Sequence, residues 1–577
     1  MARILRINTR EKTSSFEEAD GDYAGLGGRA LTSRIIRNEV PPTCHPLSGD
    51  NKLIAAAGLL TGTIAANSGR ISVGGKSPLT KGIKESNSGG VFSQKMAKLD
   101  ILGLILEDKP EEDADPAVIF INKDTVKIES APELAGLGTY DSVDKLTQKY
   151  GSDAGIMVVG PAGENLLLGA SIQFTDPRGR PSRAAGRGGL GALMGSKKIK
   201  AVVVDDSGCK APEMADKDAF RDAAKRWAKI LTDHPVTGQG LPSYGTSILI
   251  NIINEAGALP TKNFREGRFE FAQDISGEHM VELINERGGV AKEGCHPGCV
   301  IQCSQEFRDK EGKYVTSGFE YETVWAFGAN TTIKDLDIIA QMDRACDDIG
   351  LDTIEMGNTV AVAMEKGVVD WGDGPAALEL LKRTRDPKDY LGRIIGNGAA
   401  FTGEALGVDR VPVVKRQALP AYDPRSVKGV GVTYATSTMG ADHTAGYAVC
   451  QNILKVGGDI DPLCKGGNVE TSKALQIATA AVDSTGLCLF VAFAVLDTED
   501  ALEVVSQMIS ARFGIDFTPD DVSKAGTAVL QDELAFNEAA GLTKASDQLP
   551  EFFSKEKLPP HDTIWDYTIE ELQQAKV

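Results

Sequence analysis

The sequence predicts a mixed α+β protein in which a β-rich N-terminal domain precedes two mainly α-helical domains. Before residue 208, short apolar runs alternate with polar residues and predict strands, because successive strand side chains face opposite sides. After residue 211 the apolar residues recur at helical spacing. A proline-rich stretch at 412–424 indicates a second boundary, so we expect domains at residues 1–208, 209–415 and 416–577.

In the first domain, glycine-rich connections separate the expected elements. Two of these passages, residues 67–90 and 176–195, also carry many cations. Glycines let main-chain N–H groups approach an anion, and arginine can hold a phosphate with two hydrogen bonds. The residues leave two alternatives open, a solvated turn-rich surface or a site for a phosphorylated cofactor. We expect strands at residues 4–7, 103–107, 117–121, 155–159 and 200–204, and a helix at 29–37.

Helices dominate the two later domains. Thr518 followed by Pro519 predicts a helix start, since threonine caps a helix and proline suits the first turn. Further helices are expected at residues 215–232, 335–366, 473–481 and 498–512.

Charge and composition exclude some classes of function. The 577 residues carry a net charge of −19, which leaves no basic surplus for binding nucleic acid. The longest apolar stretch, residues 53–66, is too short to span a bilayer, and the N-terminus lacks the apolar core of a signal peptide. We therefore expect a cytoplasmic protein, in which clustered cysteines indicate metal binding or catalysis more than disulfides.

Three of the nine cysteines, Cys295, Cys299 and Cys303, lie within nine residues. Pro297 and Gly298 between them predict a loop rather than a helix. With a fourth thiolate from elsewhere, such a loop can hold an iron–sulfur cluster or a zinc ion. Three local ligands with one remote ligand favour the cluster. A zinc site and a fortuitous cysteine-rich loop stay open as alternatives.

A short motif that occurs twice in the sequence suggests the remote ligand. Residues 347–352 and 483–488 share the pattern D-x-x-G-L-x, and each follows a helical run. Glycine commonly ends a helix in this way, so either copy alone could be an ordinary helix stop. The second copy ends in Cys488, which is our candidate for the fourth cluster ligand.

Three side chains are candidates for acid–base chemistry. Glu320 and Glu322 precede an apolar helical run, and a carboxylate that enters an apolar environment has a raised pKa. The alternative is a pair of solvated carboxylates at a helix start. His443 follows a glycine-containing loop, and a structural histidine is the alternative reading there.

Taken in order, these features resemble the aldehyde:ferredoxin oxidoreductase family of tungsten-bis-pterin enzymes over essentially the whole chain. The residues that carry the resemblance are 25–31, 75–80, 86–90, 183–197, the three-cysteine loop, 320–323, His443 and both D-x-x-G-L motifs.

The resemblance implies a fold and a set of cofactors. The N-terminal domain would be a β-saddle carrying the metal-pterin, capped by the two helical domains. The D-x-x-G-L turns would bind one pterin each, and cations of the glycine-rich passages would meet the pterin phosphates, which a magnesium ion bridges. By residue, the resemblance assigns Asp347, Asp352, Asp483 and Leu487 to the pterins, Arg70, Lys76, Arg183 and Arg187 to the phosphates, Asn87 and Ala184 to the magnesium site, and Cys295, Cys299, Cys303 and Cys488 to a [4Fe–4S] cluster.

The resemblance also implies an activity, the oxidation of an aldehyde to a carboxylic acid at tungsten, or at molybdenum held by the same pterins. Glu322 would transfer the proton with Glu320 in reserve, and His443 would bind the carbonyl or oxo oxygen. Electrons would pass to ferredoxin or an iron–sulfur subunit, within a homodimer or hetero-oligomer. A reductive subunit like that of the benzoyl-coenzyme A reductases is one alternative, and a zinc-stabilised binding protein without redox chemistry is another.

Two departures from the family pattern are visible. The first loop reads C-x3-C-x3-C, whereas C-x2-C-x3-C is usual in the family. Some members carry an E-x-x-H pair that holds an iron between subunits, and the corresponding residues here are 341–344, Gln-Met-Asp-Arg. We therefore predict no bridging iron.

Overall fold

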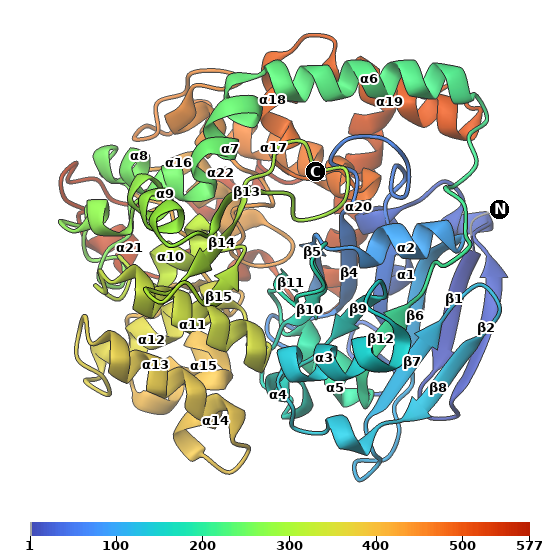
Figure 1. The fold of residues 1–577 in the computed structure, drawn as a ribbon. Helices are drawn as coiled ribbons and strands as arrows, with labels where there is room; N and C mark the ends of the chain where they lie inside the picture. Colours follow the sequence, from blue (N-terminus) through green and yellow to red (C-terminus); the bar gives the residue numbers. More distant parts are fainter. Residues whose placement is uncertain (1–2) are drawn as a thin grey trace.

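Two six-stranded sheets form the N-terminal part of the computed structural model, which describes residues 3–577 (Figure 1). Within each sheet one strand pair is parallel, β1 with β6 and β12 with β7, and the other pairs are antiparallel. The first sheet runs β2 (Thr13–Glu18), β1 (Arg3–Asn8), β6 (Ile101–Glu107), β3 (Leu53–Ala57), β4 (Ile71–Lys76), β5 (Ile83–Ser88). The second runs β11 (Arg183–Ala185), β10 (Ile172–Phe174), β9 (Gly155–Val158), β12 (Ile199–Val204), β7 (Ala117–Ile121), β8 (Val126–Ser130).

Alternate side chains of a strand point to opposite faces of its sheet, and this alternation explains how the sheets pack. In β12, Val202 and Val204 join a core shared with the first sheet, whereas Ala201 and Val203 face the other way. Helix α3 (Thr139–Tyr150) covers that other face, and α1 (Gly28–Glu39) covers the equivalent face of the first sheet. The inner strands of both sheets are therefore buried on two sides, whereas the edge strands are exposed, β2 largely and β8 in part.

The expected strands and the helix after residue 28 are present. The glycine-rich passages, however, contain strands β4, β5 and β11 where the sequence predicted only connections. Their small residues serve close packing rather than turns. A Cβ on Gly74, for example, would lie 2.6 Å from Cβ of Thr32 on α1. The absence of bulky side chains hid these strands from a pattern search.

Helices make up most of the remaining chain, as predicted. The three-cysteine loop lies between β13 and β14 of a small sheet, and α10, α11 and α12 follow it. The segments of this middle region are α6 (Lys217–Asp233), α7 (Leu241–Tyr244), α8 (Leu249–Glu255), α9 (Gly277–Glu286), β13 (Val290–Glu293), β14 (Ser304–Arg308), β15 (Tyr314–Ser317), α10 (Tyr321–Phe327), α11 (Leu336–Ile349), α12 (Thr353–Glu365), α13 (Gly374–Lys382), α14 (Tyr390–Gly396) and α15 (Gly398–Leu406).

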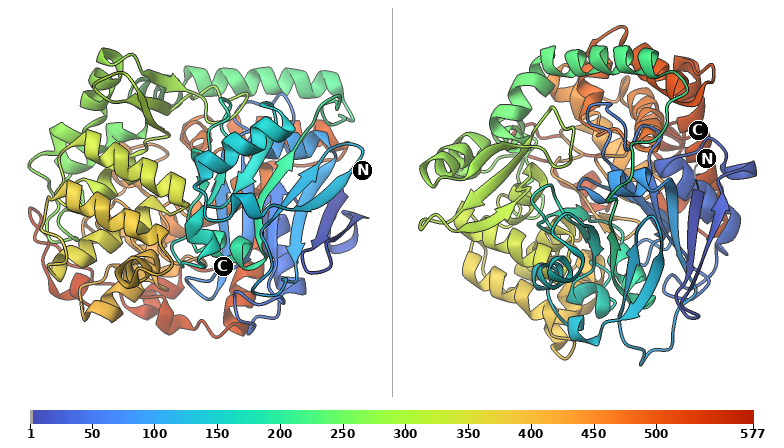
Figure 2. Two further views of the ribbon diagram at one scale, coloured as in Figure 1. Left: turned by 60° about the horizontal axis from the view of Figure 1, so that its bottom comes forward. Right: turned by 45° about the vertical axis from the view of Figure 1, so that its right-hand side comes forward.

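The last part of the chain returns to the first sheet. Helix α20 begins at the predicted position, where Thr518 and Asp521 form a capping box, and it packs against α1 and α17. Figure 2 shows the helical part beside the two sheets, with α6 and α19 along one edge.

The remaining segments are α2 (Phe92–Lys98), α4 (Pro161–Glu164), α5 (Leu190–Ser196), β16 (Val413–Val414), β17 (Gln417–Ala418), α16 (Lys428–Thr436), α17 (Asn468–Thr485), α18 (Val491–Asp497), α19 (Ala501–Phe513), α20 (Pro519–Ala539), α21 (Phe552–Lys555) and α22 (Ile569–Gln573).

Within residues 3–577, no helix combines the length and the apolarity needed to span a bilayer.

Candidate active site

The two D-x-x-G-L motifs form the C-terminal ends of α11 and α17. Gly350 and Gly486 occupy the left-handed region there, with φ of 79° and 81°. Each turn lies against a glycine of the N-terminal part of the chain. A Cβ on Gly160 would come within 2.3 Å of the Ile349 carbonyl oxygen, and one on Gly58 within 2.0 Å of the Gly486 nitrogen. Glycine is required at both contacts because the two backbones touch.

Each motif also meets the N-terminus of a helix that covers one sheet. Ala30 N on α1 donates to Ser484 Oγ at 3.1 Å, and Thr139 Oγ1 on α3 donates to the Asp347 carbonyl at 2.8 Å. The sequence carries a signal of this correspondence that our sequence analysis missed. The tetrapeptide Ala-Gly-Leu-Gly occurs at 24–27 and again at 135–138, directly before α1 and α3.

A cavity of about 360 Å³ lies between the two turns. Most of the predicted site residues line it, although they come from distant segments of the chain. They are Arg70, Asn87, Arg183, Ala184, Arg187, Cys295, Cys303, Glu320, Glu322, Asp347, Asp352, His443, Asp483 and Cys488.

Three predicted residues do not line the cavity. Lys76 is turned away, and its ammonium donates to the carbonyls of Pro42 and Cys44. The expectation that Lys76 meets a phosphate in this cavity is therefore not met by the geometry. Leu487 is buried within the second turn, and Cys299 lies next to the cavity-lining Cys295.

Glu322 and His443 form a half-buried pair that lines the cavity. Glu322 Oε1 lies 3.4 Å from His443 Nε2, while Oε2 accepts a hydrogen bond from Ala421 N at 3.0 Å. Burial raises the pKa of Glu322 to about 8 and lowers the pKa of His443 to about 4. At neutral pH both side chains are therefore uncharged. Because Oε2 already accepts the amide, the carboxylic proton belongs on Oε1, which has no hydrogen-bond partner among the described residues.

Asp442, which directly precedes His443, forms a buried ion pair with Lys84. Lys84 Nζ lies 3.1 Å from Asp442 Oδ2, and both side chains are buried. Burial opposes ionisation of Asp442, but the charges of Lys84 and Arg187 hold its pKa below the usual value. Neither Lys84 nor Asp442 was a sequence candidate, since their pairing links positions more than 350 residues apart.

Glu320 lies at a different part of the cavity from Glu322. It caps the same helix, α10, and accepts a hydrogen bond from Thr246 Oγ1 at 2.7 Å. Burial raises its pKa, partly offset by Thr246 and Arg183. The charge of Glu320 acts on Cys303, so it faces the cysteines rather than His443.

A second carboxyl group accompanies the aspartate of each turn. Burial raises the pKa of Asp483 to about 8, and the nearby Glu85 adds to the shift. Burial likewise raises the pKa of Asp347 well above its usual range, with a further contribution from Asp343. The shifts favour the protonated form of the aspartate at each turn. These acids form two acidic groups, one at each D-x-x-G-L turn.

The arginines of the cavity differ in how many of their donors are satisfied. Arg187 donates to the carbonyls of Ala441 and Ala418 and pairs with Asp352 at 3.3 Å. Arg183 is equally buried, yet its Nε and Nη2 have no hydrogen-bond partner among the described residues. Buried donors without a partner are costly, so this guanidinium is prepared for an anion.

The cysteines meet at the cavity wall next to Arg70. A Cβ on Gly89 would lie 3.0 Å from Cys295 Sγ and 3.2 Å from Arg70 Nη1. Burial raises the pKa of Cys488 to about 11, and its neighbour Cys295 contributes to that shift. Within residues 3–577, no three His, Cys, Asp or Glu side chains converge as ligands of one metal ion.

Comparison with known protein families is decisive at this point. The model "Aldehyde ferredoxin oxidoreductase, N-terminal domain" matches residues 4–206, and the model for domains 2 and 3 of the same enzyme matches residues 222–575. The chain belongs to the aldehyde ferredoxin oxidoreductase family.

Similar proteins support this assignment. The tungsten-containing aldehyde ferredoxin oxidoreductase of Pyrococcus furiosus is 37% identical, with 96% of this chain and 92% of the relative covered. The enzyme of the same name from Thermococcus kodakarensis is 36% identical with the same coverage. Among solved structures, the active-site complex BamBC of benzoyl coenzyme A reductase, in complex with 1,5-dienoyl-CoA, has a TM-score of 0.81 at 18% identity, covering 100% of this chain and 93% of that one. That likeness concerns the fold.

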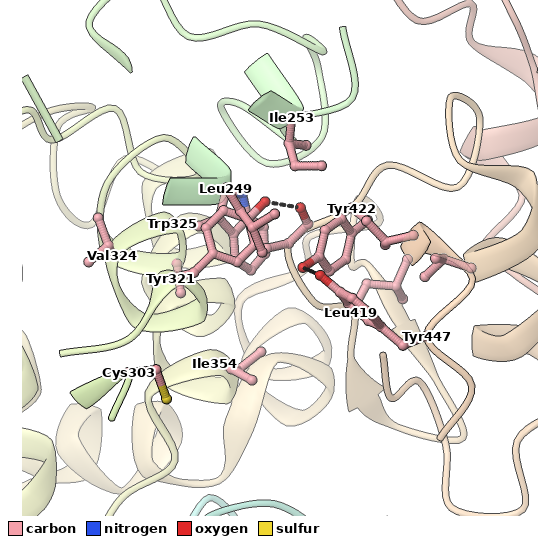
Figure 3. Packing of buried hydrophobic residues seen from close by; sticks show 14 of the residues in the cluster. Leu249, Ile253, Cys303, Tyr321, Val324, Trp325, Ile354, Leu419, Tyr422 and Tyr447 are labelled. Carbon is pink, nitrogen blue, oxygen red and sulfur yellow. Dashed lines mark hydrogen bonds between the residues drawn. The ribbon is translucent and has the colours of Figure 1, made fainter. Parts of the chain in front are cut away.

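In this member of the aldehyde ferredoxin oxidoreductase family, tyrosines line the cavity beside Glu322 and His443. Figure 3 shows Tyr321, Tyr422 and Tyr447. The rings of Tyr422 and Tyr447 each lie 6.1 Å from the His443 imidazole, and their hydroxyls bond each other at 2.7 Å. Tyr321 donates its hydroxyl to the Ala421 carbonyl. The tyrosine rings contribute to the burial that shifts the pKa values of Glu322 and His443.

Proposed function

We propose that this family member oxidises aldehydes to carboxylic acids at a tungsten-bis-pterin, or its molybdenum counterpart, bound in the cavity. The observation that carries the proposal is the uncharged Glu322–His443 pair, placed on a cavity between two D-x-x-G-L turns. The relatives of this chain are named for tungsten and for aldehyde oxidation. A proton relay on a buried cavity is what such a reaction requires of the protein.

The cavity residues fit the cofactor that the family implies. Asp347 and Asp483 would accept hydrogen bonds from one pterin each, and Asp352 and Leu487 complete the two turns. Arg70, Arg183 and Arg187 would meet phosphates, with the unpartnered donors of Arg183 as the clearest support. Magnesium would bind near Asn87 and Ala184. When bound, tungsten supplies Lewis acidity and a two-electron redox change.

The chain itself binds the aldehyde and moves a proton. Glu322 exchanges a proton at Oε1, assisted by His443 Nε2 at 3.4 Å. A neutral His443 orients the carbonyl oxygen by hydrogen bonding, and the tyrosine rings contribute to its burial. Glu320 is the reserve acid, although its position beside the cysteines makes Glu322 the better candidate.

Cys295, Cys299, Cys303 and Cys488 would hold a [4Fe–4S] cluster, which supplies one-electron transfer. Its natural acceptor is ferredoxin or an iron–sulfur subunit. Thiolate ligands need a reducing compartment, which supports a cytoplasmic location. A homodimer or a hetero-oligomer remains our prediction for the assembly.

Elemental analysis and two assays test the proposal. The purified protein should contain tungsten or molybdenum with four irons per chain, and should reduce an artificial acceptor with aldehydes. Protein that contains zinc alone would contradict the proposal. Turnover of aromatic coenzyme A thioesters without any aldehyde oxidation would instead favour the reductive alternative, whose fold this chain shares.

A further inference from the structure

Asn67 occupies an unusual position in the connection between β3 and β4. It is fully buried, and its φ of 61° lies in the left-handed region. Asparagine tolerates this conformation better than most residues, but it still costs free energy that other contacts must offset. The contacts that offset it all involve the segments that carry the four cysteines.

Four hydrogen bonds connect Asn67 to those segments. Three reach the three-cysteine loop: its main-chain N donates to the Gly298 carbonyl at 3.1 Å, Oδ1 accepts from Val300 N at 3.0 Å, and Nδ2 donates to Cys299 Sγ at 3.4 Å. The fourth reaches the other motif, since Cys488 N donates to the Asn67 carbonyl at 2.8 Å. One side chain and its peptide groups thus connect Cys299 to Cys488.

The side chain does two separable things. Its oxygen fixes the main chain next to Cys299, and its N–H group points at the sulfur itself. Hydrogen bonds to cluster sulfurs are among the factors that set an iron–sulfur potential. A donor stabilises the more negative, reduced cluster, so its presence raises the reduction potential.

We infer that Asn67 is a positioning residue for the cluster, holding Cys299 and Cys488 in register while its amide raises the reduction potential. The inference rests on the proposed function, because it needs a [4Fe–4S] cluster on the four cysteines. Asn67 does not line the cavity and contacts no catalytic group, so the experiments below read the cluster itself and not turnover.

Two substitutions separate the two roles. Asn67→Asp keeps an oxygen for Val300 N but removes the donor to Cys299 Sγ, whereas Asn67→Ala removes both. We expect both variants to have a more negative cluster potential in an EPR-monitored redox titration, the uncharged alanine variant included. Asn67→Ala should also lose its cluster to an iron chelator about tenfold faster than wild type, with the aspartate variant less affected.

Gln94→Ala is the matched control. Gln94 Nε2 donates to the Pro297 carbonyl at 2.8 Å, so it bonds the same loop without reaching a sulfur or the Cys488 segment. This variant should keep the wild-type potential and chelator rate. If Asn67→Ala fails to fold by circular dichroism, Asn67→Gly, which is also uncharged and suits the left-handed conformation, decides through its potential.

Two outcomes would count against the inference in different ways. If wild-type protein holds the cluster and oxidises aldehydes, but both Asn67 variants match Gln94→Ala in potential, the inference alone is overturned. If wild-type protein binds no four-iron cluster under reducing, iron-replete expression, the proposed function and the inference are both overturned.

Discussion

Replacing Glu322 by glutamine tests whether this residue transfers a proton or has only a structural role. Glutamine has the shape of the protonated glutamate present at neutral pH, but it cannot release the proton from the Oε1 position. Glu322→Gln should therefore lower turnover of an aldehyde by about 10²- to 10⁴-fold, with metal and iron content unchanged. Steady-state assays with an artificial acceptor measure this loss, and unchanged turnover would remove Glu322 from the mechanism.

The raised pKa values of Glu322 and Asp483 make the stability of the cofactor-free protein depend on pH. Both acids titrate near pH 4 in an unfolded chain but at about 8 when folded. The folded state holds more protons between these values, so its stability falls as pH rises. His443, with its lowered pKa, acts in the opposite direction only below pH 6.5.

We therefore expect the thermal midpoint of the cofactor-free protein to fall from pH 6.5 to pH 8. Scanning calorimetry of wild type and Glu322→Gln measures it, and the variant should show a shallower slope because glutamine does not titrate. Identical slopes would mean that Glu322 is already ionised in the folded state.

A substitution at Arg183 should affect cofactor binding and the stability of the fold differently. Arg183→Met removes a buried charge with two unpartnered donors and keeps an unbranched, flexible side chain. We expect the cofactor-free protein to unfold at the same or a higher temperature, because an uncompensated polar group is lost. The protein purified from tungstate-supplied cells should nevertheless contain less tungsten. Full tungsten content in this variant would contradict a phosphate-binding role.

Among the elements, the D-x-x-G-L turns depend on glycine contacts that no side chain could replace. In Gly58→Ala the new Cβ would lie 2.0 Å from the Gly486 nitrogen, so the second turn must move. We expect a loss of about 1–3 kcal/mol in the free energy of unfolding, together with reduced cofactor content. Gly466→Ala is the control, since its Cβ would meet nothing within 4 Å. Denaturant unfolding and metal analysis of both variants test this expectation.

Most elements could be predicted from the sequence because their apolar residues follow one period. The strand at 199–204 and helix α20, with its Thr518 cap, are examples. Strands β4, β5 and β11 could not, because glycine, serine and charged residues give no alternation that a pattern can register. Their burial comes from α1 and the cavity, which are tertiary features.

At the scale of the molecule, motifs predicted which side chains gather at the cavity but not how they pair. The pairs Lys84–Asp442 and Asp483–Glu85 join segments hundreds of residues apart, and a single sequence contains no record of such distances. Lys76 shows the converse, since its place in a matched motif does not tell that its ammonium donates to the Cys44 carbonyl.

Arg344 on α11 bears on whether an iron ion could bridge two chains. Arg344, at the position where some relatives have a histidine ligand, lies over the Tyr140 ring at 3.3 Å and donates to the Val315 carbonyl. A guanidinium held this way does not coordinate iron. Metal analysis should therefore find no iron beyond the four of the cluster, and one additional iron per two chains would contradict this.

The contact between Gly58 and Gly486 can form only after most of the chain has been synthesised. At synthesis rates of about 5–20 residues per second, the second turn leaves the ribosome roughly 20 to 90 s after Gly58. Until then the first sheet lacks the segment that closes one side of the cavity. The cavity of the nascent chain is therefore open on that side until α17 docks.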